Sequence, residues 1–193
     1  MIVGLTGGTG CGKTTALRAF EALGGVVLDC DEIYHELLRS DRNLLRAIGE
    51  RFPGTVKEDL LDRKALGALV FSDRQALLDL NGITHKAVKA KVLERIAAAP
   101  GHVAIDAIGL FEGELAELCQ ETVAVTAPEE CRVARLMARD GISAEYAEKR
   151  IAAQRPQSEF AQLCRYTLHN DGTEKQFYEK CLAFFKALGI MKP

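Results

Sequence analysis

Gly-Gly-Thr-Gly-Cys-Gly-Lys-Thr, residues 7–14, is the stretch that decides the fold of this chain. It matches the phosphate-binding pattern G-x-x-x-x-G-K-[ST] in full. An apolar run at 2–5 precedes it and a helical pattern at 15–23 follows it. A strand before the loop and a helix after it are what phosphate binding at a helix N-terminus requires. The sequence therefore predicts a loop that binds a nucleoside triphosphate; the alternative is a glycine-rich turn that binds nothing.

The positions of this loop have distinct expected roles. Its glycines let backbone N–H groups turn towards the phosphates. Lys13 is expected to reach the β- and γ-phosphates, and the Thr14 hydroxyl to bind Mg²⁺. The residues expected around ATP in this stretch are Gly8, Gly10, Cys11, Gly12, Lys13, Thr14 and Thr15.

Cys11 is expected to differ from the other cysteines. Converging N–H groups, the start of a helix and nearby Lys13 should all lower its pKa and make it the most reactive thiol. The alternative is an inert thiol packed against the sheet. The other five cysteines show neither a C-x-x-C pair nor zinc spacing with a histidine, which indicates a reducing compartment, and we expect the cytoplasm. They are Cys30, Cys119, Cys131, Cys164 and Cys181.

Composition limits the class of protein. The chain has 193 residues, of which 48% are hydrophobic and 27% charged, so it can bury one core with insertions. A net charge of −2 gives no general attraction to nucleic acid or to an anionic membrane. No apolar run approaches the roughly 18 residues that a membrane span needs, and no basic stretch precedes the first apolar run. We expect no nucleic-acid or membrane partner, and a monomer or weak oligomer.

Strands alternate with helices along much of the chain, which is typical of a parallel sheet with helices on both faces. Strands are expected at 2–5, 26–28, 103–105, 122–125 and 166–168. Helices at 43–51, 63–70, 74–80 and 84–98 interrupt the alternation, and charged helices at 130–139 and 144–154 interrupt it again. We therefore predict an α/β fold: a P-loop kinase core with a roughly five-stranded parallel sheet, a helical substrate-binding insertion and a helical lid. The expected parts are core at 1–36, 101–129 and 161–193, substrate subdomain at 37–100 and lid at 130–160.

Acidic residues end two of the expected strands, where the ligand cleft of an open α/β sheet lies. Asp31 could accept the proton of a hydroxyl that attacks the γ-phosphate, or it could cap the helix that follows. Asp29, two residues earlier in an extended segment, would lie on the same side and could orient Asp31. Asp106 could hold Mg²⁺ or could be a strand-end cap.

Basic residues gather on the two charged helices. Guanidinium groups stabilise the charge of a phosphoryl group in transfer, although such a set can also be a solvated surface. Next to a P-loop core we favour a lid, hinged near 126–127 and near 156. His85 could bind the second substrate or begin a helix. The arginines are Arg132, Arg135, Arg139, Arg150 and Arg155.

Taken in order, these motifs resemble the dephospho-coenzyme A kinase family nearly from end to end. Residues 4–15 are similar to its opening G-L-T-G-G-I-G-S-G-K-S-T, and Asp29-Cys30-Asp31 is similar to its D-A-D segment. Its L-D-R-x-x-L…V-F, I-x-H and L-F-E stretches correspond to 61–71, 83–85 and 110–112. Its lid and terminal N-x-G correspond to Arg135, Arg139, Arg150 and Gln154, then Asn170-Asp171-Gly172.

The resemblance implies transfer of the ATP γ-phosphate to the ribose 3′-hydroxyl of dephospho-CoA, with Mg²⁺ as the metal. It implies a general base at Asp31 and further catalytic roles for Lys13 and Arg139. Arg135, Asn170 and Gly172 would join the nucleotide site, the last two near the adenine. The acceptor would contact Asp31, Arg63, His85 and Glu112, and the metal would contact Thr14 and Asp106.

Some positions depart from the family pattern. Lys86 replaces a proline, Ile108 and Gly109 replace Pro and Leu, Cys164-Arg165 replaces Ala-Asp, and Cys11 replaces Ser. Alternative functions are a kinase of another small hydroxyl substrate such as a nucleoside, a GTP-dependent switch, and a catalytically dead binding module. The D-x-x-G at 106–109 favours the switch, but no N-K-x-D follows to read guanine. Lys13, Thr14, Asp31 and Asp106 count against the dead module.

Overall fold

The computed structural model describes residues 1–191. They divide into two compact units, one of Met1–Leu28 with the chain from Ala99 onward, and one of Asp29–Ala98. From the sequence, we expected the boundary between the core and the substrate subdomain at 36/37. The observed division falls at the start of a helix, so Asp31 belongs to the helical second unit.

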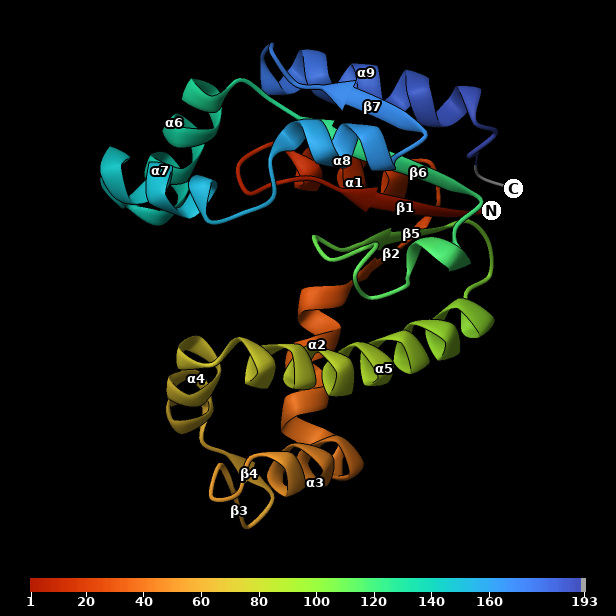
Figure 1. Ribbon diagram of the computed structural model, residues 1–193. Coiled ribbons are helices and arrows are strands. Elements are labelled where there is room, and N and C mark those ends of the chain that lie inside the picture. The colour runs from red at the N-terminus through yellow and green to blue at the C-terminus, as the bar shows by residue number, and fades with distance from the viewer. Residues whose placement is uncertain (192–193) are drawn as a thin grey trace. The chain divides into compact units, whose positions relative to one another are not determined.

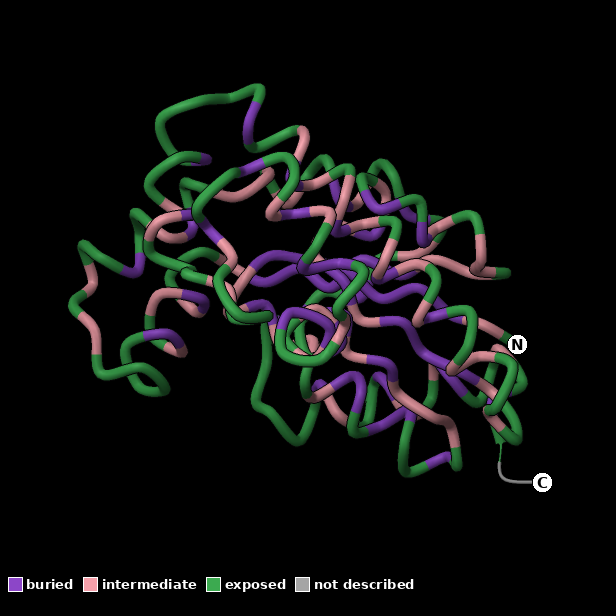
Figure 2. The backbone as a smooth tube through the Cα atoms, turned by 90° about the horizontal axis from the view of Figure 1, so that it is seen from below, coloured by how far each residue is buried: buried purple, intermediate pink, exposed green. Residues whose placement is uncertain are grey.

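A five-stranded sheet in the order β2-β5-β1-β6-β7 forms the first unit (Figure 1). The pairs β1–β5, β1–β6 and β6–β7 are parallel, so the predicted parallel sheet of five strands is confirmed. The strands are rich in Val, Ile, Leu and Ala because both faces of the sheet are covered, and Figure 2 shows buried segments at this centre. Their bounds are β1 Ile2–Thr6, β2 Val26–Asp29, β5 Val103–Asp106, β6 Glu121–Thr126 and β7 Tyr166–His169.

Helices α1 and α9 pack together beside this sheet through aromatic side chains. The rings of Phe20 and Phe185 meet edge to face at 5.2 Å, and both residues are buried. Gly24, at φ 87°, ends α1 in the left-handed conformation expected there. The helical elements of this unit are α1 Lys13–Ala22, η1 Ala116–Leu118, α6 Glu129–Asp140, α7 Ala144–Ala152, α8 Gln157–Leu163 and α9 Glu174–Ala187.

Helix α8 was not predicted. The sequence assigned residues up to 160 to the lid, but α8 buries Phe160 beside Ala124 of β6 and Cys164. Pro156 stands at the N-cap of α8, where its fixed φ favours the beginning of a helix as well as the end of the previous one. Residues 157–160 therefore pack with the sheet.

The second unit is mainly helical, with α5 packed against α2, α3 and α4 (Figure 1). It differs from the prediction in two places. Helix α5 runs unbroken through Gly82, where two helices were expected. A small antiparallel hairpin, β3–β4, turns through Glu58 and Asp59, both at positive φ. The bounds are α2 Cys30–Ser40, α3 Arg42–Arg51, β3 Val56–Lys57, β4 Leu60–Leu61, α4 Arg63–Ser72 and α5 Arg74–Ala98.

Candidate active site

The phosphate-binding loop joins β1 to α1. Gly7, Gly10 and Gly12 have φ of 141°, 76° and 104°, a region where a side chain is strained. Gly12, the N-cap of α1, has no side chain to cap the helix, and the start of a helix without such a cap favours an anion. Lys13 folds back and donates from Nζ to the Gly7 carbonyl at 2.8 Å. The local geometry is that of an anion-binding loop.

Two side chains from the charged helical segment hold Thr9 in this loop. Arg132 Nε donates to the Thr9 carbonyl at 2.9 Å, and Gln154 Oε1 accepts from the Thr9 N–H at 2.8 Å. Both peptide groups of Thr9 are therefore fixed by residues 123 and 145 positions away.

Asn170 and Arg135 hold the next part of the loop. Asn170 is 4% exposed, and its Nδ2 donates to the Cys11 carbonyl at 2.9 Å. Its Oδ1 accepts from Arg135 Nη2 at 3.1 Å, and Arg135 Nη1 donates to the Gly10 carbonyl at 3.2 Å. Both ends of the Asn170 amide thus support the loop. Gly172 lies exposed in the turn before α9.

The expectation for Cys11 was wrong. Its thiol is 1% exposed, and burial raises its pKa, outweighing the charges of Lys13 and Arg132, which lower it. A buried thiol with a raised pKa is a poor nucleophile. The alternative, an inert thiol packed inside the fold, describes this residue.

Of the two expected metal ligands, Thr14 is the last residue of the loop, and Asp106 lies on the strand next to β1, which leads into the loop. Asp106 ends β5, and its register partner is Leu5 of β1, two residues before Gly7. Thr14 is exposed in the first turn of α1, and Asp106 is half-buried. Among residues 1–191 no group of three or more His, Cys, Asp or Glu side chains could hold a metal ion. An ion held by Thr14 and Asp106 alone would need phosphate oxygens as further ligands.

Asp29, not Asp31, caps the helix that follows β2. Its Oδ1 accepts from the backbone N–H groups of Asp31 at 2.8 Å and Glu32 at 3.0 Å. The alternative that made Asp31 the cap is therefore wrong, and so is the extended geometry expected for the pair. Asp31 lies in the first turn of α2 with an exposed side chain, while Asp29 fixes its backbone.

A pocket of about 200 Å³ lies in the second unit. Arg63 and Tyr34 are among its lining residues, and burial raises the pKa of Tyr34, which the charge of Arg63 opposes. His85 is half-buried in the middle of α5 and does not begin a helix. The pocket is lined by Tyr34, His35, Leu38, Leu61, Arg63, Leu66, Gly67, Val70 and Leu80.

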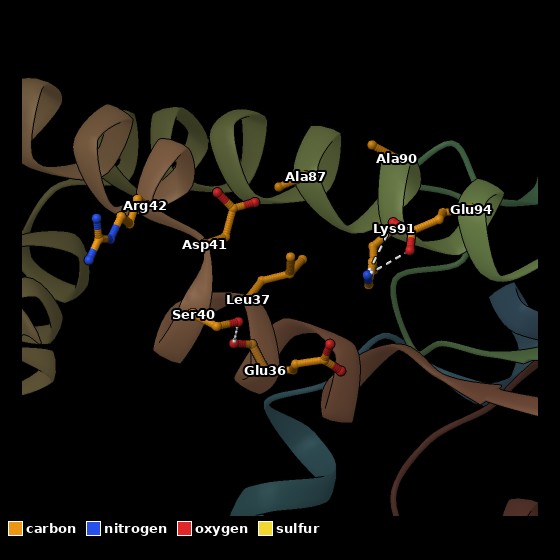
Figure 3. A pocket seen from close by; sticks show the side chains of 9 residues that line it. All are labelled: Glu36, Leu37, Ser40, Asp41, Arg42, Ala87, Ala90, Lys91 and Glu94. Carbon is orange, nitrogen blue, oxygen red and sulfur yellow. Dashed lines mark hydrogen bonds and ion pairs between the residues drawn. The ribbon is translucent and has the colours of Figure 1, made fainter. Parts of the chain in front are cut away.

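A larger, charged pocket of about 520 Å³ lies between α2 and α5 of the same unit. Figure 3 shows Lys91 turned towards Glu94, with which it forms an ion pair at 2.9 Å. Glu36 pairs with Arg95, and Asp41 caps α3. Arg42, which also lines the pocket, pairs with Asp59, so each charged side chain of the lining already has a partner.

Arg139 was expected to be catalytic, but within residues 1–191 it pairs with Asp140 and forms no hydrogen bond to the loop. Its Nε donates to Asp140 Oδ1 at 2.7 Å, and Arg150 donates to the same carboxylate at 2.6 Å. These two arginines lower the pKa of Asp140 to about 2. The loop is contacted instead by Arg135 and by Arg132, which the predicted site omitted. The signal for Arg132 was its spacing of three residues from Arg135 on one helix.

Comparison with known proteins gives one consistent result. A family model described as dephospho-CoA kinase matches residues 1–176. The dephospho-CoA kinase of Carboxydothermus hydrogenoformans is 33% identical over 96% of this chain and 93% of its own. That of Geobacter sulfurreducens is 36% identical over 91% of this chain and 92% of its own.

Solved structures that resemble this chain include a dephospho-CoA kinase. The crystal structure of TT1252 from Thermus thermophilus matches with a TM-score of 0.81 and 32% identity, covering 100% of this chain and 98% of that one. Dephospho-CoA kinase from Campylobacter jejuni matches with a TM-score of 0.68 and 26% identity, covering 97% and 96%. A shikimate kinase from Bacteroides thetaiotaomicron, at a TM-score of 0.57 and 18% identity, shares the fold.

Proposed function

This chain belongs to the dephospho-CoA kinase family, and we infer from that membership how its own residues move the γ-phosphate of ATP to the ribose 3′-hydroxyl of dephospho-CoA. The observation that carries the mechanism is the fully supported phosphate-binding loop. Its N–H groups and Lys13 would bind the polyphosphate, and phosphoryl transfer depends mainly on such positioning and charge neutralisation.

We assign the general base to Asp31. Its carboxylate is exposed and its backbone is fixed by Asp29, which leaves the Asp31 oxygens available for the acceptor hydroxyl. Tyr34 and His35 follow it by three and four residues on α2, so they share a helix face with it. The pocket beyond them is apolar with Arg63 among its lining residues, which suits an acceptor with an apolar ring and a phosphate. His85 and Glu112 complete the proposed acceptor contacts.

The nucleotide contacts follow from the loop. Arg135, Asn170 and Gly172 would flank the bound ATP, and Arg139 would reach its phosphates only after leaving Asp140. Thr14 and Asp106 would hold Mg²⁺, which supplies charge neutralisation to the phosphates when bound.

We propose a cytoplasmic location, because all six cysteines are free thiols and reduced thiols persist in that compartment. No helix within residues 1–191 is long and apolar enough to cross a membrane. We also propose that the chain acts as a monomer or weak oligomer.

A coupled assay tests the function. Purified protein with ATP and dephospho-CoA should release ADP and form coenzyme A, while adenosine and pantetheine should give no turnover above background. GTP in place of ATP tests the nucleotide. Turnover on adenosine equal to that on dephospho-CoA would favour a nucleoside kinase instead.

A further inference from the structure

Arg132 of α6 is a buried cation, and no carboxylate among residues 1–191 forms an ion pair with it. Its side chain is 3% exposed, and Nε donates to the Thr9 carbonyl. Nη2 is buried without a hydrogen-bond partner among residues 1–191. Glu129, one turn earlier, is exposed and acts on Arg132 through its charge without forming an ion pair. Burial of a charge without a counter-ion is unfavourable, so this position is costly to the folded chain by itself.

The absence of a side chain at Gly8 leaves room for the Arg132 guanidinium, and its absence at Gly10 leaves room for the Arg132 backbone. A Cβ on Gly8 would stand 2.5 Å from Arg132 Nη2, and one on Gly10 would stand 2.9 Å from the Arg132 carbonyl. The unpaired end of Arg132 therefore lies directly against the backbone of the phosphate-binding loop. Any side chain at Gly8 would displace it.

We propose that Arg132 is a positioning residue whose missing counter-ion is the triphosphate of ATP. Its charge acts across the Gly8–Thr9 backbone, and Lys13 acts from the other end of the loop. Low dielectric around the buried guanidinium strengthens this attraction. The bound nucleotide would supply the negative charge that Arg132 lacks in the folded protein without ligand. The inference rests on the proposed function only in taking ATP as the anion.

Two substitutions separate charge from shape. Arg132→Gln removes the charge, and Arg132→Lys keeps it while losing the planar fork. Titration calorimetry with ATP alone should show affinity at least about tenfold weaker for Arg132→Gln, because the attraction between two charges is large at contact and falls with distance. For Arg132→Lys the affinity should be close to wild type. Inorganic tripolyphosphate should show the same ranking, since the attraction is to the phosphates. Arg18→Gln, which removes an exposed arginine paired with Glu174, is the matched control and should bind ATP as wild type does.

Thermal unfolding without ligand distinguishes an Arg132 that attracts phosphates from an Arg132 that only supports the fold. We expect Arg132→Gln to unfold at or above the wild-type temperature, because it removes an uncompensated buried charge, and to show a smaller rise on adding ATP. A lower unfolding temperature with undiminished ATP affinity would overturn the proposal. If Arg132→Gln fails to fold, weak ATP binding by Arg132→Lys alone would overturn it, because charge would then not be what the site needs. Wild-type protein that binds no ATP would instead overturn the proposed function.

Discussion

The side chains that support the phosphate-binding loop bond mainly to its carbonyl groups. Arg132, Arg135 and Asn170 all donate to loop carbonyls. These bonds engage loop carbonyls, so the loop N–H groups remain as the donors that we expect to bind phosphates. The exception is the Thr9 N–H, which Gln154 occupies. The loop is therefore preorganised by its neighbours.

Substitution of Asp31 tests its assignment as the base. We expect Asp31→Asn to lower kcat by roughly 10²–10⁴-fold, because an amide cannot accept the proton of the acceptor hydroxyl. ATP affinity should stay unchanged, since Asp31 lies outside the loop. Lys13→Ala should instead weaken ATP binding and turnover together. Steady-state kinetics with calorimetry measures both, and Asp31→Asn retaining more than a third of wild-type turnover would show that another group takes the proton.

Alkylation should avoid Cys11. In the native protein at pH 8, we expect iodoacetamide to label Cys131 first, because it is half-buried on α6 while Cys11 is buried with a raised pKa. Peptide mapping after brief labelling identifies the site. Cys131→Ser should remove most of the early label, and ATP-protected inactivation that maps to Cys11 would contradict this expectation.

At this scale, sequence predicts the chemistry of a residue better than its environment. The sequence pattern alone identified the phosphate-binding motif and the two acidic residues Asp29 and Asp31. Which aspartate caps α2 depends on where the helix begins, and a start two residues earlier, at Cys30, makes Asp29 the cap in place of Asp31. The Cys11 pKa depends on burial, which packing of distant segments decides. That packing also brings Arg132 to the loop.

Secondary structure could be predicted where one local signal dominates. The β-branched strands and the paired helices α6 and α7 were expected close to their observed bounds. Helix α5 continues through Gly82 because packing against three other helices outweighs one weak residue. The hairpin β3–β4 lacks the usual Asn-Gly signal at its turn, and α8 is too short to show periodicity. Tertiary contacts decide these elements.

The lid should be shorter than its predicted range. We expect a non-hydrolysable ATP analogue to slow hydrogen exchange across α6 and α7, and not in α8, because Phe160 anchors α8 to the sheet. Gln157 also bonds both peptide groups of Ala127, at 2.7 and 2.9 Å, which ties the two expected hinge regions together. Hydrogen exchange with mass spectrometry measures each helix.

Two outcomes would count against this division. Equal slowing in α8 would mean that the mobile part extends beyond Pro156. Unchanged exchange in α6 and α7 at saturating ligand would mean that there is no lid. Gln157→Ala serves as the matched variant: it should raise exchange around Ala127 without ligand, because it removes both bonds to that residue.

Across the whole molecule, buried thiols make stability depend on alkaline pH. Burial raises the pKa of Cys119 and Cys181 to about 12, and that of Cys164 to about 11. In the unfolded chain a cysteine ionises near pH 8.5. Above that pH the unfolded state has lost protons that the folded state keeps, so the free energy of unfolding falls as pH rises. This contribution is present in full below about pH 8.5.

Cys181 offers the sharpest test because it is fully buried in the main core. Between about pH 8.5 and pH 10 one such thiol should cost about 2 kcal/mol of unfolding free energy. Urea unfolding at pH 7.5 and pH 10 should therefore show a large loss for the wild type and a loss about 2 kcal/mol smaller for Cys181→Ala. The alanine variant starts from a lower stability at pH 7.5, since it leaves a small cavity. The effect of the thiol is therefore read from the change in unfolding free energy between the two pH values, not from either value alone. If this change is the same in both proteins, burial does not raise the pKa of Cys181.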